Sequence, residues 1–116
     1  MVRESRQRLT GQSAFEAVFR EGRRRDGDYL QIVSTAAALE RGRVGFVIGR
    51  RALPRAVDRN RIRRMLRAVL ARARPGIDTH DVIVRLKRTV DRAVFPAVVA
   101  EAERMLATLA GCGSVR

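Results

Sequence analysis

The chain contains few of the residues from which protein-built catalytic centres are usually made. Its 116 residues include one cysteine, one histidine and no tryptophan. Cys112 has no partner for an internal disulfide, and neither Cys112 nor His80 stands near a second metal-binding side chain. His80 is expected in a loop. The sequence therefore argues against a zinc site and against a Ser-His-Asp triad, and we assign no catalytic and no metal-binding residue.

Long apolar runs and paired carboxylates are also missing. No apolar stretch reaches the roughly 18 residues of a transmembrane helix, and residues 1–13 lack the apolar segment of a signal peptide. We therefore expect a cytoplasmic protein. The twelve acidic residues are scattered, without the paired carboxylates that bind two Mg²⁺ ions. The sequence thus offers no nuclease centre of its own.

Length and composition predict one folded domain over residues 1–116. The hydrophobic content of 46% is enough for a chain that folds around one modest core. No repeat, low-complexity tract or linker divides it. Within that domain the positive charge is unevenly distributed. The formal net charge is +13, and ten arginines against one acid, Asp58, fall between residues 50 and 74. Arginine suits bidentate phosphate contacts and stacking on bases, so a polyanionic partner is indicated.

Residues 58–74 are predicted to form one basic helix, with Asp58 as candidate N-cap and Pro75-Gly76 as the stop. Leu53-Pro54 breaks the chain before it, so the helix begins near Arg55 or Asp58. The apolar residues have the spacing of one buried stripe, which comprises Ile62, Met65, Leu66, Val69, Leu70 and Ala73. The opposite side carries Asn60, Arg63, Arg64, Arg67 and Arg74. Like charges on one helix repel each other, so a partner with dense negative charge is the favoured interpretation. A solvated basic face is the alternative.

The remaining elements are shorter. A capping box at Ser13–Glu16 predicts a helix over about 13–20 that Gly22 ends. Strands are predicted over 29–35, 43–48 and 81–87, with the basic run 23–25 as a loop. A last helix is predicted to begin at Pro96 and end at Gly111. Phe15 and Phe19 lie one turn apart, and either core packing or a stacking platform for bases explains them. The order predicts a small sheet with helices packed on it.

The chain resembles a known family at its basic helix. Arg59-Asn60-Arg61, followed by Arg63, Arg64 and Arg67, resembles the RNR signature of the protein subunit of bacterial ribonuclease P. An RNR alone is weak evidence in an arginine-rich chain, but further matches follow in the family's order. They are Arg8-Leu9, Phe15 to Phe19, Gly22, Gly45 to Arg51, and Asp81 to Val84. The resemblance covers about residues 8–109, which would be the structured core between a basic N-terminal tail and a short C-terminal tail.

The resemblance implies an α+β fold of the order α-β-β-β-α-β-α. This is a two-layer sandwich with a small mixed sheet, similar to domain 2 of ribosomal protein S5. It needs a fourth strand, which would lie in 36–41 or in 23–27. It also implies a left-handed crossover from the strand at 43–48 to the strand at 82–87, whereas general packing rules predict a right-handed one.

The resemblance also implies a function. In that family an RNA hydrolyses precursor tRNA and releases the 5′ leader, while the protein binds the leader and helps the RNA to hold Mg²⁺. The expected partners are the catalytic RNA subunit and precursor tRNA, with no membrane and no DNA. The residues matching the RNA-binding signature are Arg59, Asn60, Arg61, Arg63, Arg64 and Arg67. The residues matching the leader-binding cleft are Phe15, Phe19, Phe46, Val47, Arg50 and Arg51. Core packing is the alternative for the three phenylalanines, and we expect at least one of them in the core.

Two departures from the family pattern bear on the cleft. Val33 stands where some relatives have an aromatic residue, and Gly49 where they often have a small polar one. Less stacking would then be available, and leader contacts would depend more on charge and backbone. Three other functional classes remain open. They are a non-enzymatic RNA-binding protein of the ribosomal type, a stand-alone nuclease, and a binder of acidic proteins. A helix-turn-helix is disfavoured because strands flank the basic helix.

Overall fold

The computed structural model describes residues 12–37, 42–74, 76–77 and 79–115. In chain order the elements are α2 (Gln12–Glu21), β1 (Arg23–Asp26), β2 (Leu30–Ala36), β3 (Val44–Val47), α3 (Ala56–Ala73), β4 (His80–Leu86), a 3₁₀ turn (Arg92–Val94) and α4 (Phe95–Val115). None of these helices is long and apolar enough to cross a membrane. The predicted matches at Arg8-Leu9 and the predicted stop at Pro75 lie outside the described residues.

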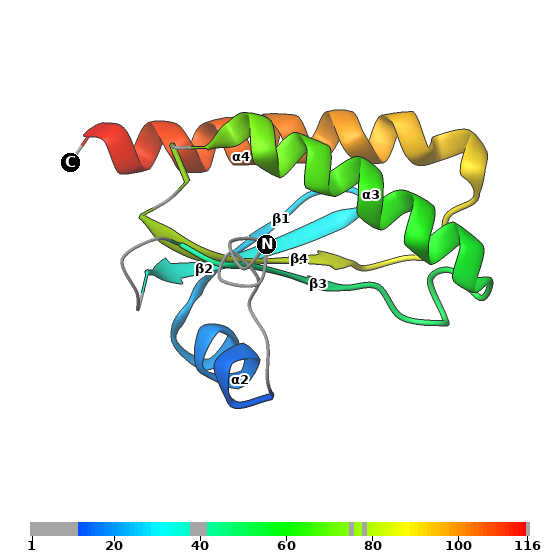
Figure 1. Cartoon of the computed structure of the whole chain (residues 1–116), viewed down its shortest axis with the longest axis horizontal. Coiled ribbons are helices and arrows are strands. Elements are labelled where there is room, and N and C mark those ends of the chain that lie inside the picture. The colour runs from blue at the N-terminus through cyan, green and yellow to red at the C-terminus, as the bar shows by residue number, and fades with distance from the viewer. Residues whose placement is uncertain (1–11, 38–41, 75, 78, 116) are drawn as a thin grey trace, which may run out of the picture.

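The four strands form one mixed sheet in the order β1-β2-β4-β3. β1 pairs antiparallel with β2, and β2 antiparallel with β4, whereas β3 and β4 are parallel. Parallel neighbours need a crossover, and α3 provides it by returning over the sheet between β3 and β4 (Figure 1). The crossover is left-handed, as the resemblance implies. The element order, the mixed four-stranded sheet and this crossover together confirm the expected α+β fold.

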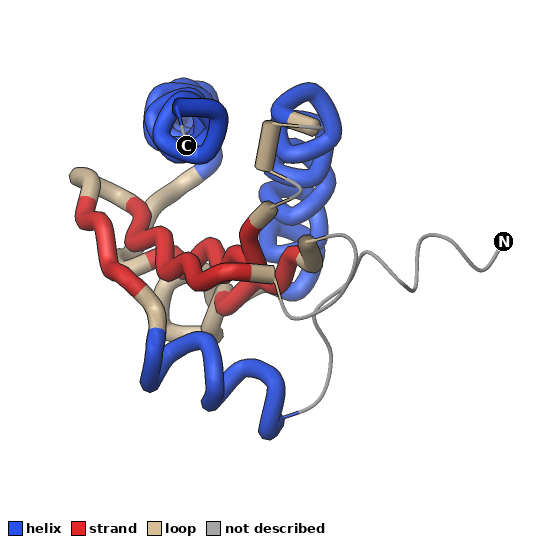
Figure 2. The backbone as a smooth tube through the Cα atoms, turned by 90° about the vertical axis from the view of Figure 1, so that its left-hand side faces the viewer, coloured by secondary structure: helices blue, strands red, loops and turns tan. Residues whose placement is uncertain are grey.

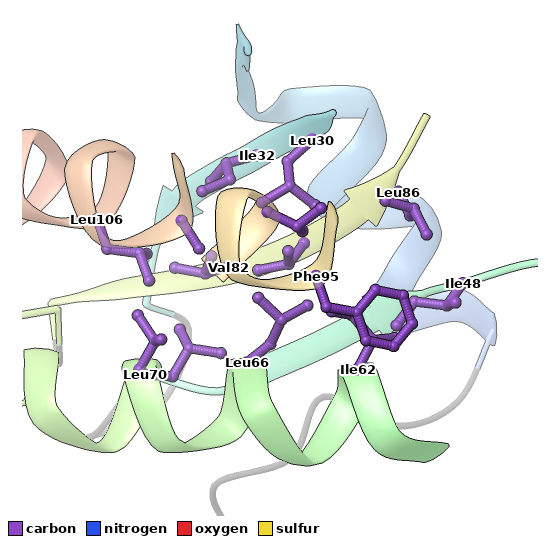
Figure 3. Packing of buried hydrophobic residues seen from close by; sticks show 14 of the residues in the cluster. Leu30, Ile32, Ile48, Ile62, Leu66, Leu70, Val82, Leu86, Phe95 and Leu106 are labelled. Atoms are coloured by element: carbon purple, nitrogen blue, oxygen red, sulfur yellow. The ribbon is translucent and has the colours of Figure 1, made fainter. Parts of the chain in front are cut away.

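Helices cover both faces of the sheet. α3 and α4 lie side by side on one face, and α2 lies alone on the other (Figure 2). The predicted two-layer sandwich therefore describes the sheet with α3 and α4, while α2 adds a helix on the opposite side. The main core lies between the sheet and the helix pair and includes Leu30, Ile32, Ile62, Leu66 and Phe95 (Figure 3). A separate small cluster under α2 consists of Val18, Val33 and Ile83.

The basic helix forms largely as its spacing predicts. Ile62, Leu66, Val69 and Leu70 are buried, as expected for one stripe facing the core. The earlier of the two predicted starts is confirmed, because α3 begins at Ala56 with Arg55 as its N-cap residue. The prediction of Asp58 as the N-cap is wrong, and Arg55 makes no side-chain cap. Asp58 instead lies in the first turn, where the positive end of the helix dipole stabilises its carboxylate.

The side chain of Asp58 has a partner far along the chain. Arg92 Nε donates to Asp58 Oδ1 at 2.8 Å, so this carboxylate ties the start of α3 to the turn before α4. The ion pair joins two segments that only the tertiary fold brings together. A cap could be predicted from the neighbouring residues, whereas this partner could not.

The fourth strand lies in the second of the two predicted ranges. Arg23–Asp26 forms β1 at the edge of the sheet, so the prediction of a basic loop at 23–25 was wrong. Its sequence, RRRD, has neither the alternation nor the β-branched residues of a strand. Pairing with β2 imposes the extended conformation, with Arg23 opposite Ser34 and Arg24 opposite Val33.

Three other boundaries differ from the prediction. α2 begins at Gln12, whose Nε2 donates to Glu16 Oε2 at 2.9 Å, so Ser13 is not its cap. His80 opens β4 instead of lying in a loop, because its backbone continues the pairing of β4 with β2 at Ala36. α4 runs past Gly111 and Gly113 to Val115, since each glycine weakens a helix by only about 1 kcal/mol. Gly22 does end α2, and its N–H donates to Val18 O at 2.7 Å.

One buried carboxylate joins α4 to the turn between β1 and β2. Glu101 is 4% exposed, yet its side chain has no cationic partner among the described residues. Its Oε1 accepts from the N–H of Asp28 at 2.8 Å, and its Oε2 from the N–H of Leu30 at 2.8 Å. The N–H of Tyr29 lies within 3.2 Å of both oxygens. The carboxylate thereby satisfies three consecutive backbone donors and fixes the turn that leads from β1 into β2.

Candidate nucleic-acid interface

The exposed side of α3 carries the predicted RNA-binding signature. Asn60, Arg61, Arg64 and Arg67 are exposed, and Arg63 is half-buried. Arg63 Nη1 donates to Asn60 Oδ1 at 3.1 Å, which holds these two polar groups together on one side of the helix. The structure therefore places this part of the signature on one surface that faces away from the core.

Arg59 differs from the rest of the signature because its guanidinium is used inside the protein. Its Nη1 donates to Leu53 O at 2.8 Å and to Pro54 O at 2.9 Å. Both carbonyls belong to the loop that leads from β3 into α3. Arg59 therefore fastens this loop to the first turns of the helix, a role that the signature alone did not reveal.

Phe46 does not lie on the same face of the sheet as Phe15 and Phe19. Successive strand residues point to opposite faces, so Phe46 packs with the main core under α3 and α4, while Val47 packs with the cluster under α2. The guanidinium of Arg67 lies 5.7 Å from the centre of the Phe46 ring. Of the two alternatives for Phe46, core packing therefore holds, and its placement in one cleft with Phe15, Phe19 and Val47 is wrong.

The two aromatic residues of α2 are half-buried. Phe15 and Phe19 both pack against the cluster of Val18, Val33 and Ile83 and keep part of their surface exposed. Each ring therefore packs against the core on one part of its surface and remains accessible to solvent on another. Arg24 on β1 donates from Nη2 to Phe19 O at 3.0 Å, and its guanidinium lies 5.8 Å from the centre of the Phe19 ring.

A row of three polar side chains and one valine crosses the sheet on the same face as α2. The strand register places Asp26 on β1 beside Gln31 on β2, then Arg85 on β4, then Val47 on β3. Arg85 Nη1 donates to Gln31 Oε1 at 3.3 Å, and Gln31 Nε2 donates to Asp26 Oδ1 at 3.1 Å. We call these four residues the sheet row. Sequence reasoning missed Asp26, Gln31 and Arg85, because only the register of four strands brings them together.

The carboxylate of the sheet row has a cationic partner just outside the row. Lys87 Nζ lies 3.3 Å from Asp26 Oδ1 and donates to Gly27 O at 2.9 Å. The hydrogen bond from Gln31 lowers the pKa of Asp26 below its usual value, and the hydrogen bond from Lys87 lowers it further. Asp26 is thus held as a carboxylate at neutral pH, while Arg85 is exposed to solvent.

Arg50 and Arg51 lie in the exposed turn that follows β3. Leu53 N–H donates to Gly49 O at 3.1 Å, and Thr89 Oγ1 donates to Arg51 O at 3.0 Å, so the turn is held from two sides. The turn leads directly into α3, and the two arginines therefore lie in the chain between the β3 end of the sheet row and the signature. No cluster of three or more metal-binding side chains occurs among the residues that the structure describes.

The family model for ribonuclease P matches residues 4–110 of the chain. The chain belongs to the ribonuclease P protein family. It is 38% identical over 108 residues to the ribonuclease P protein component of Acidothermus cellulolyticus, covering 90% of this chain and 89% of that one. It is 31% identical over 105 residues to the corresponding protein of Chromobacterium violaceum, with 90% and 87% covered.

Solved structures of this family share the fold. A mutant RNase P protein of Staphylococcus aureus superposes with a TM-score of 0.76 at 17% identity, covering 97% of this chain and 92% of that one. The RNase P protein of Thermotoga maritima gives a TM-score of 0.69 at 21% identity, with 89% and 94% covered. The three helices and the mixed four-stranded sheet are those of RNase P proteins.

Family membership identifies the chain as the protein component of an endoribonuclease. It implies the RNA subunit and precursor tRNA as partners, and processing at the tRNA 5′ end as the process. The two departures from the family pattern also have structural explanations. Val33 is fully buried beneath α2 and presents no surface for stacking. A Cβ at Gly49 would meet open space, so a larger residue would fit there.

Proposed function

We propose that this protein binds the 5′ leader of precursor tRNA on the sheet face that carries α2. The leader-binding surface comprises the sheet row together with Phe15, Phe19, Arg50 and Arg51. The observation that supports it most directly is the pairing of half-exposed aromatic rings on α2 with polar and cationic side chains on the same face of the sheet. Single-stranded RNA is bound by this combination, because rings stack on bases and cations neutralise phosphates.

We also propose that the exposed side of α3 binds the catalytic RNA. Arg61, Arg64 and Arg67 are exposed on it, and the acid nearest to them in sequence, Asp58, is paired with Arg92. The local charge is therefore of one sign, which suits a structured polyanion. Asn60 and Arg63 complete this surface. Arg59, near the start of α3, supports it by binding two carbonyls of the loop before the helix.

The proposed contribution to catalysis is electrostatic. The RNA subunit performs the hydrolysis and holds Mg²⁺, and the arginines of the two surfaces lower the repulsion between catalytic RNA and substrate. Lower repulsion between two polyanions lets the complex form, and helps to retain divalent cations, at lower Mg²⁺ concentration. A cytoplasmic location follows for the same proposal, because precursor tRNA is processed there.

The deciding experiment is cleavage of a precursor tRNA at low Mg²⁺ in four mixtures: protein alone, catalytic RNA alone, both, and neither. Cleavage that requires both components, or is far faster with both, supports the proposal. Cleavage by the protein alone would mean that the protein has a nuclease centre. Failure of the protein to stimulate the RNA would leave a general RNA-binding protein.

A further inference from the structure

We propose that the β1 edge of the sheet is an additional RNA-backbone site, which holds leader nucleotides farther from the cleavage point than those on the leader-binding surface. The site consists of Arg20 at the end of α2 and Arg23 and Arg24 on β1. Its ligand is the phosphodiester backbone of single-stranded RNA. This inference rests on the proposed leader binding and extends the path of the leader beyond it.

The position of β1 in the sheet supports this path. β1 and β3 are the two outer strands, and the signature helix α3 follows β3. Three inter-strand spacings separate them, which is about 14 Å. Figure 2 shows α2 crossing below the sheet and joining β1 at one edge. An RNA strand that follows the sheet row away from α3 therefore reaches the β1 edge next.

Arg24 connects the β1 edge with the leader-binding surface. Its Nη2 donates to Phe19 O, and its guanidinium covers the Phe19 ring. These contacts hold a positive charge beside an aromatic ring that is already part of the proposed surface. A base stacked near Phe19 would therefore have its phosphate close to a cation whose position is fixed before binding, which lowers the entropy cost of the contact.

Arg20 and Arg23 extend this charge around the edge. Arg20 and Glu21 are 3.8 Å apart with side chains 69% and 64% exposed, and such a pair contributes little. Arg23 is exposed and forms no ion pair with the residues that the structure describes. Because neighbouring strand residues alternate between faces, Arg23 and Arg24 flank the edge from its two sides.

A second explanation for three arginines on an edge strand is protection against pairing with another sheet. That role requires charge but no ligand, so it predicts no dependence on the leader. The acidic residues near the edge leave the proposed site cationic. Asp26 is engaged by Gln31 and Lys87, and Glu21 faces Arg20. Leader length is therefore the variable that separates RNA binding from edge protection.

The test measures holoenzyme affinity for precursors whose leaders are lengthened one nucleotide at a time, across a range of salt concentrations. The variants are Arg20→Ala, Arg23→Ala and the double variant. Arg104→Ala is the matched control, because it removes the same charge from an exposed position on α4, which is not part of the proposed site. Thermal unfolding of each variant confirms that the fold is retained.

The proposal predicts that the double variant lowers the salt dependence of log K by about 1.4, since each phosphate contact to a single strand contributes about 0.7. This loss should appear only above a threshold leader length, and Arg104→Ala should show none. An unchanged slope at every length would overturn the β1 site. An equal loss for leaderless tRNA would overturn it too, because the contact would then lie outside the leader. In either case the proposed leader-binding surface would still be supported if the affinity of the wild-type holoenzyme depends on leader length and Phe15→Ala removes that dependence.

Discussion

The carboxylate of Glu101 occupies space that a side chain at Gly27 would fill. A Cβ built at Gly27 would collide with Oε2 and Cδ of Glu101. Gly27 lies just before the three residues whose N–H groups Glu101 accepts. The β1–β2 turn therefore packs closely against α4 at this point. The buried carboxylate of Glu101 fits there because residue 27 has no side chain.

Removing this carboxylate should destabilise the fold. We expect Glu101→Ala to lower the free energy of unfolding by about 3 kcal/mol, because backbone donors at the turn lose a charged acceptor. Urea denaturation measures the loss. Glu103→Ala is the control on the same helix, since it removes only an exposed ion pair with Arg72 and should cost less than about 1 kcal/mol. Equal losses for the two variants would contradict the proposed role of Glu101.

Gly27→Ala should also destabilise the protein, because the new methyl group displaces the carboxylate. The two substitutions should not be additive. In the Glu101→Ala background the methyl group meets no carboxylate, so Gly27→Ala should cost clearly less than it does in the wild type. A double-mutant cycle by urea denaturation tests this. Additive losses would show that the glycine is needed for a reason other than Glu101.

Alanine variants of Arg59 and Arg61 should have different effects, one on stability and the other on RNA binding. Arg59→Ala should lower the free energy of unfolding by about 1–2 kcal/mol, because two loop carbonyls lose their donor. Arg61→Ala should change stability by less than about 0.5 kcal/mol, but reduce the salt dependence of binding to the catalytic RNA by about one unit. Denaturation and salt titration measure the two effects. An unchanged slope for Arg61→Ala would remove this residue from the RNA interface.

Phe15 and Phe46 allow a matched test of leader binding, because they are half-buried rings on opposite faces of the sheet. Both alanine variants should lose stability through lost packing, by about 2 kcal/mol. Only Phe15→Ala should weaken binding of precursors with a long leader relative to leaderless tRNA. Equal effects of both variants on all substrates would point to a folding defect instead of a lost contact.

His80 should make the stability depend on pH. Burial lowers the pKa of His80 below 6.5, and the positive charge of Arg25 lowers it further. The unfolded chain therefore binds a proton more readily than the folded chain. Stability should be fully present above pH 6.5 and should fall as the pH drops toward the folded-state pKa. His80→Gln should remove this part of the decline, as unfolding curves at several pH values would show. Identical pH profiles for the two proteins would contradict it.

Local sequence patterns predicted the elements that are stabilised by local spacing. The stripe from Ile62 to Leu70 alone predicts α3 and its buried side, because apolar residues that recur at helical spacing lie on one side of a helix. β1 could not be found this way, because its conformation comes from pairing with β2. The family resemblance did limit it to two ranges. The choice between core and cleft for Phe46 stayed open, because a shift of one residue along a strand reverses the face and the resemblance does not specify that register.

The sequence predicted one part of the candidate site, the arginines of α3, but not the other part, the sheet row. The arginines of α3 are close in sequence, so helical spacing predicts which of them share a surface. The sheet row unites Gln31 with Arg85, which are 54 residues apart. No local pattern marks either residue, and only the order β1-β2-β4-β3 makes them neighbours. The inward contacts of Arg59 depend likewise on the path of the preceding loop.

The small cluster beneath α2 has a consequence for how the protein moves. α2 is attached to the sheet through Val18, Val33 and Ile83, whereas α3 and α4 share the much larger core on the other face. Segments with few buried contacts open at lower free energy than the rest of a domain. Amide hydrogens of α2 should therefore exchange with solvent before those of α3 and β4. If α2 binds the leader as we propose, this lower stability would let the aromatic helix adjust to different leader sequences while α3 stays in place.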